Sequence, residues 1–195
     1  MTNDPRKFKR KQERHYSAHH TLLHVANLHL AKAELREPGW FYDAMITITF
    51  AALAIEAMTN AIGDCIVSDW KDFESLSPSA KARLLAENLK LEYSGTSEPW
   101  RSIKWLGKFR NQIAHPKPEH VVHEQLITDA ECDNIPFEPP KSKLEREVTL
   151  GNAKRGLKAA TDLKILLCEK IPAEDKFGLV VGGWLTSTEL HSGSG

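Results

Sequence analysis

Cysteine is scarce in this chain, and the few that are present exclude two common uses of the residue. Cys65, Cys132 and Cys168 are odd in number and far apart. They therefore form neither a paired disulfide framework nor the close spacing of a zinc site. The N-terminal residues also lack the apolar stretch of a signal peptide. These absences favour a reducing compartment, and we expect a cytoplasmic protein.

Net charge is lacking as well. The 26 Lys and Arg residues balance the 26 Asp and Glu residues, so the charge of the whole chain indicates no polyanionic partner. Residues 1–14 are an exception, because only Asp4 and Glu13 oppose six cations there: Arg6, Lys7, Lys9, Arg10, Lys11 and Arg14. This basic N-terminal arm is either solvated and frayed or in contact with nucleic acid or another anion.

Recognisable patterns for cofactors and metals are missing too. The glycines form no phosphate-binding loop, and no Ser or Cys lies in a nucleophile motif. His15 and His19, and likewise His20 and His24, are four residues apart and could chelate a metal from one helix face. No third ligand occurs at a useful spacing, so a polar helix face is the better interpretation. We expect neither a metal nor a cofactor.

Helical periodicity dominates what is present. Apolar residues recur at helical spacing over about 6–35, 42–68, a short segment after Pro78, 97–116 and 150–171. Pro38-Gly39 ends the first of these helices, and Ser97 is suited to cap the fourth. We therefore expect an all-α fold, a bundle of about five helices within residues 15–171.

The segment from Ala44 to Gly63 is apolar enough to raise the question of a membrane span. Glu56 and several Thr and Asn residues interrupt it, whereas a span needs about twenty mostly apolar residues. Apolar side chains cover all its faces, which is typical of a helix in the middle of a bundle or between subunits. We expect a buried helix and no membrane partner.

Two regions outside the helices have less regular patterns. Residues 116–143 are rich in proline, and Val121-Val122 with Leu126-Ile127 could form a short hairpin. Residues 172–195 form a C-terminal tail with an apolar patch, Phe177–Leu185. Because that patch would be exposed on a monomer, we expect a two-fold homodimer that uses residues of the fourth helix or the tail. Ser-Gly repeats end the tail, and we expect them to be disordered.

One arginine stands out on the fourth helix. Arg110 falls on the inner face defined by Leu106 and Ile113. A buried guanidinium needs an anion, a partner or a water-filled cleft. Glu56 is the single charge between Asp43 and Asp64 on the apolar helix, so the two residues are predicted to pair. The pair either fixes the register of the bundle or also orients Arg110 toward a substrate phosphate.

His115 lies at the end of the same helix, just before Pro116. A histidine there suits the helix C-terminus electrostatically. It also titrates near neutral pH and can transfer a proton. Beside an arginine, it supplies the parts for phosphodiester chemistry, in which the histidine moves the proton and the arginine stabilises charge on phosphorus.

The run from Arg110 through Asn111 to His115 resembles the signature of HEPN (higher eukaryotes and prokaryotes nucleotide-binding) domains. That signature is an arginine, usually a polar residue next, and a histidine after four to six intervening residues, near the end of a late helix. Residues 51–57, which contain Glu56, are similar to an earlier core helix of the family that often bears an acidic residue. The resemblance covers about residues 42–171.

The resemblance implies a metal-independent endoribonuclease of toxin or defence systems, with an active site assembled across a homodimer. Arg110, Asn111 and His115 would then be catalytic and Glu56 supporting. RNA would be the substrate, and an antitoxin or other protein a partner. The family also contains members with no demonstrated activity, so the alternative is a non-catalytic module that binds a protein, a nucleotide or RNA.

Overall fold

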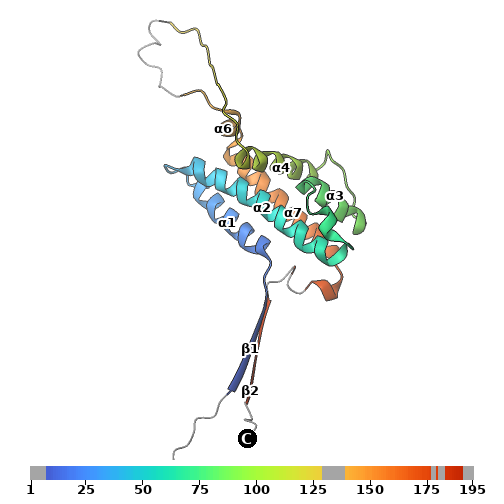
Figure 1. Ribbon diagram of the computed structural model, residues 1–195. Coiled ribbons are helices and arrows are strands. Elements are labelled where there is room, and N and C mark those ends of the chain that lie inside the picture. Colours follow the sequence, from blue (N-terminus) through green and yellow to red (C-terminus); the bar gives the residue numbers. More distant parts are fainter. Residues whose placement is uncertain (1–7, 129–138, 177–178, 180–182, 191–195) are drawn as a thin grey trace, which may run out of the picture.

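The computed structural model describes residues 8–128, 139–176, 179 and 183–190. The chain is mostly helical, and Figure 1 shows a helical bundle from one end of which a two-stranded ribbon projects. The principal helices are α1 (Ala18–Glu34), α2 (Trp40–Ile66), α3 (Pro78–Asn88), α4 (Trp100–Ala114), α6 (Lys143–Glu147) and α7 (Leu150–Lys170). Of two short 3-10 helices, η1 (Trp70–Phe73) lies between α2 and α3, and η2 (Ala173–Asp175) follows α7. The ribbon pairs β1 (Phe8–His15) with β2 (Gly183–Leu190).

Helix α2 is the centre of the bundle, as its sequence predicts. It packs against α1, α3, α4 and α7. Ile48, Ile55, Met58 and Ile62 are among its fully buried side chains. The helix is long and apolar enough to cross a membrane by length and composition, but half of that stretch is buried inside the bundle. Burial on several sides is typical of the core helix of a globular bundle, because it removes the apolar side chains from water.

Polar side chains cap the N-termini of α3, α6 and α7. The Ser77 hydroxyl accepts a hydrogen bond from the backbone of Ala80, with Pro78 in the first turn of α3. Thr149 caps α7 in the same way. Ser142 and Glu145 form a reciprocal capping box at α6. Helix α4 differs, because it begins at Trp100 with Pro99 at the cap position, so the expectation of a Ser97 cap is wrong.

The expectation of a helix from residue 6 is wrong over residues 8–15. These residues form β1, which pairs antiparallel with β2, and α1 begins only at Ala18. The fold is therefore a helical bundle with an added two-stranded sheet rather than purely α-helical. Because residues 8–15 pair with β2, they are also not the frayed arm that was one of the two expectations for the N-terminal residues. The rest of the basic arm, residues 1–7, lies outside the described residues.

The expected hairpin at residues 121–127 is also absent. Residues 116–128 are described and form neither helix nor strand. Two short apolar pairs alone do not provide a buried surface that could stabilise two strands. Of the C-terminal apolar patch, residues 177–178 and 180–182 lie outside the described residues, as does the Ser-Gly end of the tail. Within the patch, Leu179 is buried and Leu185 is exposed.

Candidate functional site

Helix α4 carries the candidate site on a well-anchored scaffold. Ile103, Leu106 and Phe109 are buried against the core, which fixes the rotation of the helix. The Trp105 indole nitrogen donates a hydrogen bond of 2.6 Å to Glu147 at the end of α6. The Arg155 guanidinium of α7 lies 4.8 Å from the centre of the Trp105 ring. Contacts from α6 and α7 therefore hold the middle of α4 in place.

Arg110 and Glu56 form the ion pair that the sequence predicts. Arg110 Nη2 contacts Glu56 Oε2, joining α4 to α2 across 54 positions of sequence. Arg110 Nη1 also donates a hydrogen bond of 3.1 Å to Oδ1 of the exposed Asn111. The side chains of Arg110 and Glu56 remain 29% and 25% exposed. The guanidinium is therefore held at the surface of the bundle, where a solvent-borne anion can approach it, and is not sealed in the core.

His115 occupies the C-cap of α4. Its backbone N–H donates a hydrogen bond of 2.9 Å to the carbonyl oxygen of Asn111, which completes the last helical turn. Its side chain is exposed. Pro116 follows at once and prevents continuation of the helix. The imidazole therefore has the accessibility that proton transfer to a bound molecule requires.

A groove opens beside His115 where the chain leaves α4 and returns into α6. It encloses about 550 Å³ and is lined by nine residues: Gln112, His115, Pro116, Lys117, Pro118, Glu119, Ser142, Lys143 and Leu144. The Glu119 carboxylate accepts a hydrogen bond of 3.1 Å from the backbone N–H of Lys143, which ties the two walls together. Lys117 and Lys143 make the groove suited to an anion.

The structure brings together only part of the predicted set. Arg110, Asn111 and Glu56 form one cluster, whereas His115 lies in the groove, of which Arg110 is not a lining residue. His115 follows the last helical residue of α4 and has a non-helical backbone, with φ of −133° and ψ of 58°. Within one chain, the groove of His115 therefore does not include the Arg110 guanidinium.

Lys117, Ser142 and Lys143 are residues that the sequence interpretation missed. Ser142 and Glu145 carry the capping-box spacing, which predicts a helix start at residue 143. No sequence signal indicates that this start lies beside His115, because residues 116–142 form a long connection without helical periodicity. The contribution of α6 to the groove is visible only in three dimensions.

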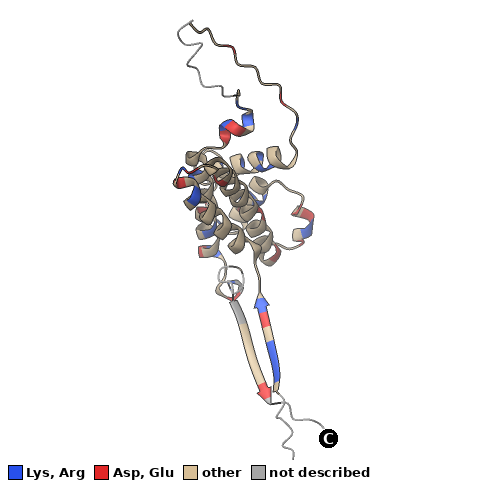
Figure 2. Cartoon of the chain, turned by 90° about the vertical axis from the view of Figure 1, so that its left-hand side faces the viewer, with Lys and Arg blue, Asp and Glu red and all other residues tan. Residues whose placement is uncertain are grey.

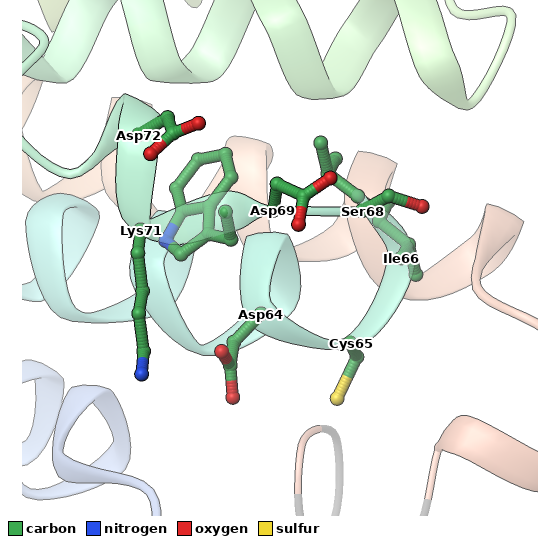
Figure 3. A pocket seen from close by; sticks show the side chains of 9 residues that line it. Asp64, Cys65, Ile66, Ser68, Asp69, Lys71 and Asp72 are labelled. Atoms are coloured by element: carbon green, nitrogen blue, oxygen red, sulfur yellow. The ribbon is translucent and has the colours of Figure 1, made fainter.

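A second hollow, of about 590 Å³, lies where α2 ends and η1 begins. Asp64, Asp69 and Asp72 line it together with Cys65 and Lys71, and Figure 3 shows Asp64 and Cys65 pointing away from Asp72. Within the described part of the chain, no group of three or more His, Cys, Asp or Glu side chains is placed to hold a metal ion. Three carboxylates disfavour a phosphate here, in contrast to the groove beside His115.

No protein family model, curated protein or solved structure matches the chain. What the protein does must therefore be argued from the arrangement of its own residues.

Proposed function

We propose that this protein is a HEPN-like, metal-independent endoribonuclease that acts as a homodimer. The observation that carries the proposal is the Glu56–Arg110 ion pair, which holds a guanidinium at the surface five residues before an exposed histidine in a cationic groove. Asn111 supports the guanidinium from the same helix. These are the side chains that cleavage of a phosphodiester without a metal needs.

In the proposed reaction, the ribose 2′-oxygen attacks the adjacent phosphorus and the bond to the 5′-oxygen breaks. The products are a 2′,3′-cyclic phosphate and a 5′-hydroxyl. His115 takes the proton of the attacking hydroxyl or gives one to the leaving oxygen. Arg110 stabilises the negative charge that develops on the phosphoryl oxygens. Since DNA lacks the 2′-hydroxyl, it cannot follow this route.

A second copy of the chain would supply the convergence that one chain lacks. Along α2, the side chains of Ile46, Leu53 and Ala57 are only half-buried, and Tyr42 is exposed. These positions recur at a spacing of four and seven residues, which places them on one stripe. Glu56, and with it Arg110, lies at the edge of this stripe. Pairing two copies through the stripe would bring two Arg110–His115 motifs toward one interface.

The proposal is tested by incubating the purified protein with mixed single-stranded RNA in the presence of EDTA. We expect cleavage that leaves 2′,3′-cyclic phosphate ends, and no cleavage of DNA of the same sequence. His115→Ala should lower the rate by roughly two to four decades while the thermal melt is unchanged. The matched control is His120→Ala, which removes an exposed histidine that does not line the groove and should cleave at the wild-type rate.

Several outcomes would reject the mechanism. These are loss of activity in EDTA, equal cleavage of DNA, and an undiminished rate for His115→Ala. Loss of activity in the His120→Ala control would show that the rate depends on the local fold and not on the proton-transfer group.

One observation favours the second candidate, a non-catalytic module that binds a protein partner, a nucleotide or RNA. The Arg110 guanidinium already engages Glu56 and Asn111, and it does not line the groove of His115. In that case the Glu56–Arg110 pair has a structural role, which is to fix the register of α4 against α2. Absence of cleavage of several RNAs by a preparation that is dimeric would favour this module.

A further inference from the structure

The β1–β2 ribbon extends away from the bundle with one strongly basic strand. All eight residues of β1 are exposed, and Figure 2 shows its cations along the ribbon, well away from the helices. The two strands come from the two ends of the chain and pair in a continuous register from Phe8 opposite Leu190 to His15 opposite Gly183. Because an isolated two-stranded ribbon is only marginally stable in water, a partner that covers one face would stabilise it.

Alternation along the strands divides the ribbon into two faces of different charge. The face that we call the arginine face carries Arg10, Gln12 and Arg14 on β1, together with Thr186 and Thr188 of β2, which pair with Gln12 and Arg10 in the register. Arg10 Nε donates to the Thr186 hydroxyl oxygen at 3.4 Å, which confirms that both side chains lie on this face. Among the described side chains here, none is acidic.

The opposite face, which we call the lysine face, is internally neutralised. Lys9 lies opposite Glu189 in the register, and Lys11 forms an ion pair with Glu13 on the same strand. Two lysines thus meet two carboxylates. The uncompensated positive charge of the ribbon is therefore concentrated on the arginine face, where Arg14 also lies 5.0 Å from the centre of the Tyr16 ring.

We propose that the arginine face of the ribbon binds the major groove of double-stranded DNA. The major groove of B-DNA is wide enough for a two-stranded β-ribbon, whereas that of A-form RNA is too narrow for side chains to read. Arginine, glutamine and threonine are the side chains that hydrogen-bond to guanine, to adenine and to either base edge. Arg10, Gln12, Arg14, Thr186 and Thr188 present this set on one surface.

Charge disfavours a second copy of the chain along the β1 edge. Two β1 strands placed edge to edge would bring eight cations together against two carboxylates, since each strand holds Lys9, Arg10, Lys11 and Arg14 against Glu13. Like charges at a strand edge prevent such pairing. A polyanion meets the same edge favourably, because each phosphate neutralised by a cation releases condensed counterions.

The ribbon and the groove of His115 lie at opposite ends of the bundle. Figure 1 shows the ribbon leaving from the end where α1 begins, whereas α6 and the end of α4 lie at the other. Between them lies α2, whose 27 residues span about 40 Å. The DNA-binding proposal therefore does not rest on the proposed nuclease: the His115→Ala variant should bind DNA as the wild type does.

The test is a fluorescence anisotropy titration of the full chain with a short, mixed-sequence DNA duplex. We expect Arg10→Ala/Arg14→Ala to weaken binding by roughly 10- to 100-fold. The matched control is Lys9→Ala/Lys11→Ala, which makes the same charge change on the same strand and should weaken binding by less than about 3-fold.

Equal weakening by the two double variants would overturn the proposal, because it would indicate charge alone and not the arginine face. A larger loss of RNA binding than of duplex DNA binding in the arginine variant would overturn it as well, as would no binding of duplex DNA by the wild type. Thermal melts of both variants should match the wild type, since every substituted side chain is exposed.

Discussion

At the scale of single residues, the Glu56–Arg110 pair is the feature with the clearest energetic consequence. Both side chains are about three-quarters buried, so removing one leaves a charge partly desolvated and without its partner. Water still reaches the pair, which lowers the cost below that of a fully buried one. We predict that Glu56→Ala lowers the free energy of unfolding by about 1–3 kcal/mol, measured by chemical denaturation.

A double-mutant cycle separates the interaction from the loss of each side chain. The exposed Arg83–Glu87 pair on α3, whose side chains are 62% and 55% exposed, is the matched control. Its coupling should not exceed about 0.5 kcal/mol. A Glu56–Arg110 coupling no larger than that of the control would show that the pair does not fix the register of the bundle.

His19 is a buried histidine at the junction of ribbon and bundle. Its Nδ1 lies 2.8 Å from the Ser17 hydroxyl oxygen, and burial, with smaller contributions from His20 and Lys164, lowers its pKa to about 4. The unfolded chain, with a pKa near 6.5 for this residue, binds the proton more readily than the folded one. The free energy of unfolding is therefore unaffected by protonation of His19 above about pH 6.5, and it decreases as the pH falls from there toward 4.

We predict that the free energy of unfolding falls by up to about 3 kcal/mol over that pH range because of His19. Urea denaturation at a series of pH values measures the effect. In His19→Gln this part of the pH dependence should disappear, whereas the exposed His24→Gln should retain it. A wild-type-like pH profile in His19→Gln would assign the acid sensitivity to other groups.

At the scale of elements, the end of α2 depends on a glycine that its neighbour leaves no room to replace. A Cβ at Gly63 would lie 2.4 Å from the Trp70 ring, which is 2% exposed. Trp70 packs there as η1 turns the chain back toward α3. We predict that Gly63→Ala destabilises the fold by about 1–3 kcal/mol through displacement of the indole ring, as measured by thermal unfolding.

Gly107→Ala is the matched control, because it is also a helical glycine but its Cβ would meet only Pro78 at 3.9 Å. There the entropic advantage of alanine should raise stability by about 0.5–1 kcal/mol. If Gly63→Ala were equally stabilising, Trp70 would have to find another position at no cost.

Five of the six described helices could be predicted from the sequence, while the short α6 and both strands were missed. Periodicity and Pro78 located α2, α3 and α7 to within two residues, because an apolar face buried in a bundle leaves a strong repeat. Strand β1 leaves no such repeat, since both its faces are exposed and polar. Its partner is also more than 160 residues away, beyond any local signal.

The candidate site, like the fold, could be predicted only in part. Two lone charges on two apolar helices, Glu56 and Arg110, identified each other as partners. The sequence also located His115 at the end of α4. Its groove was not predictable, because no signal in the sequence indicates that Lys143 lies beside Lys117 in space.

At the scale of the whole molecule, the stripe along α2 is the contact surface that we propose for a second copy of the chain. Ile46 and Leu53 are half-buried and, unlike Phe50, are not among the side chains packed against the core. Together with the exposed Tyr42 they form an apolar band on the helix that carries Glu56. Apolar bands of this kind on a globular domain mark contact surfaces, and a two-fold axis through the band is self-complementary.

We predict that the protein is a homodimer at tens of micromolar concentration, with a light-scattering mass of twice the 21.9 kDa of one chain. Leu53→Glu places a charge in the middle of the stripe and should yield a monomer with an intact helical circular dichroism spectrum. Ile165→Glu, at a position of α7 that is 51% exposed and away from α2, should remain dimeric.

If the dimer brings two motifs together, Leu53→Glu should also lose RNA cleavage although Arg110 and His115 are unchanged. A wild-type mass of one chain would refute the dimer, and dissociation by Ile165→Glu in place of Leu53→Glu would move the interface to α7.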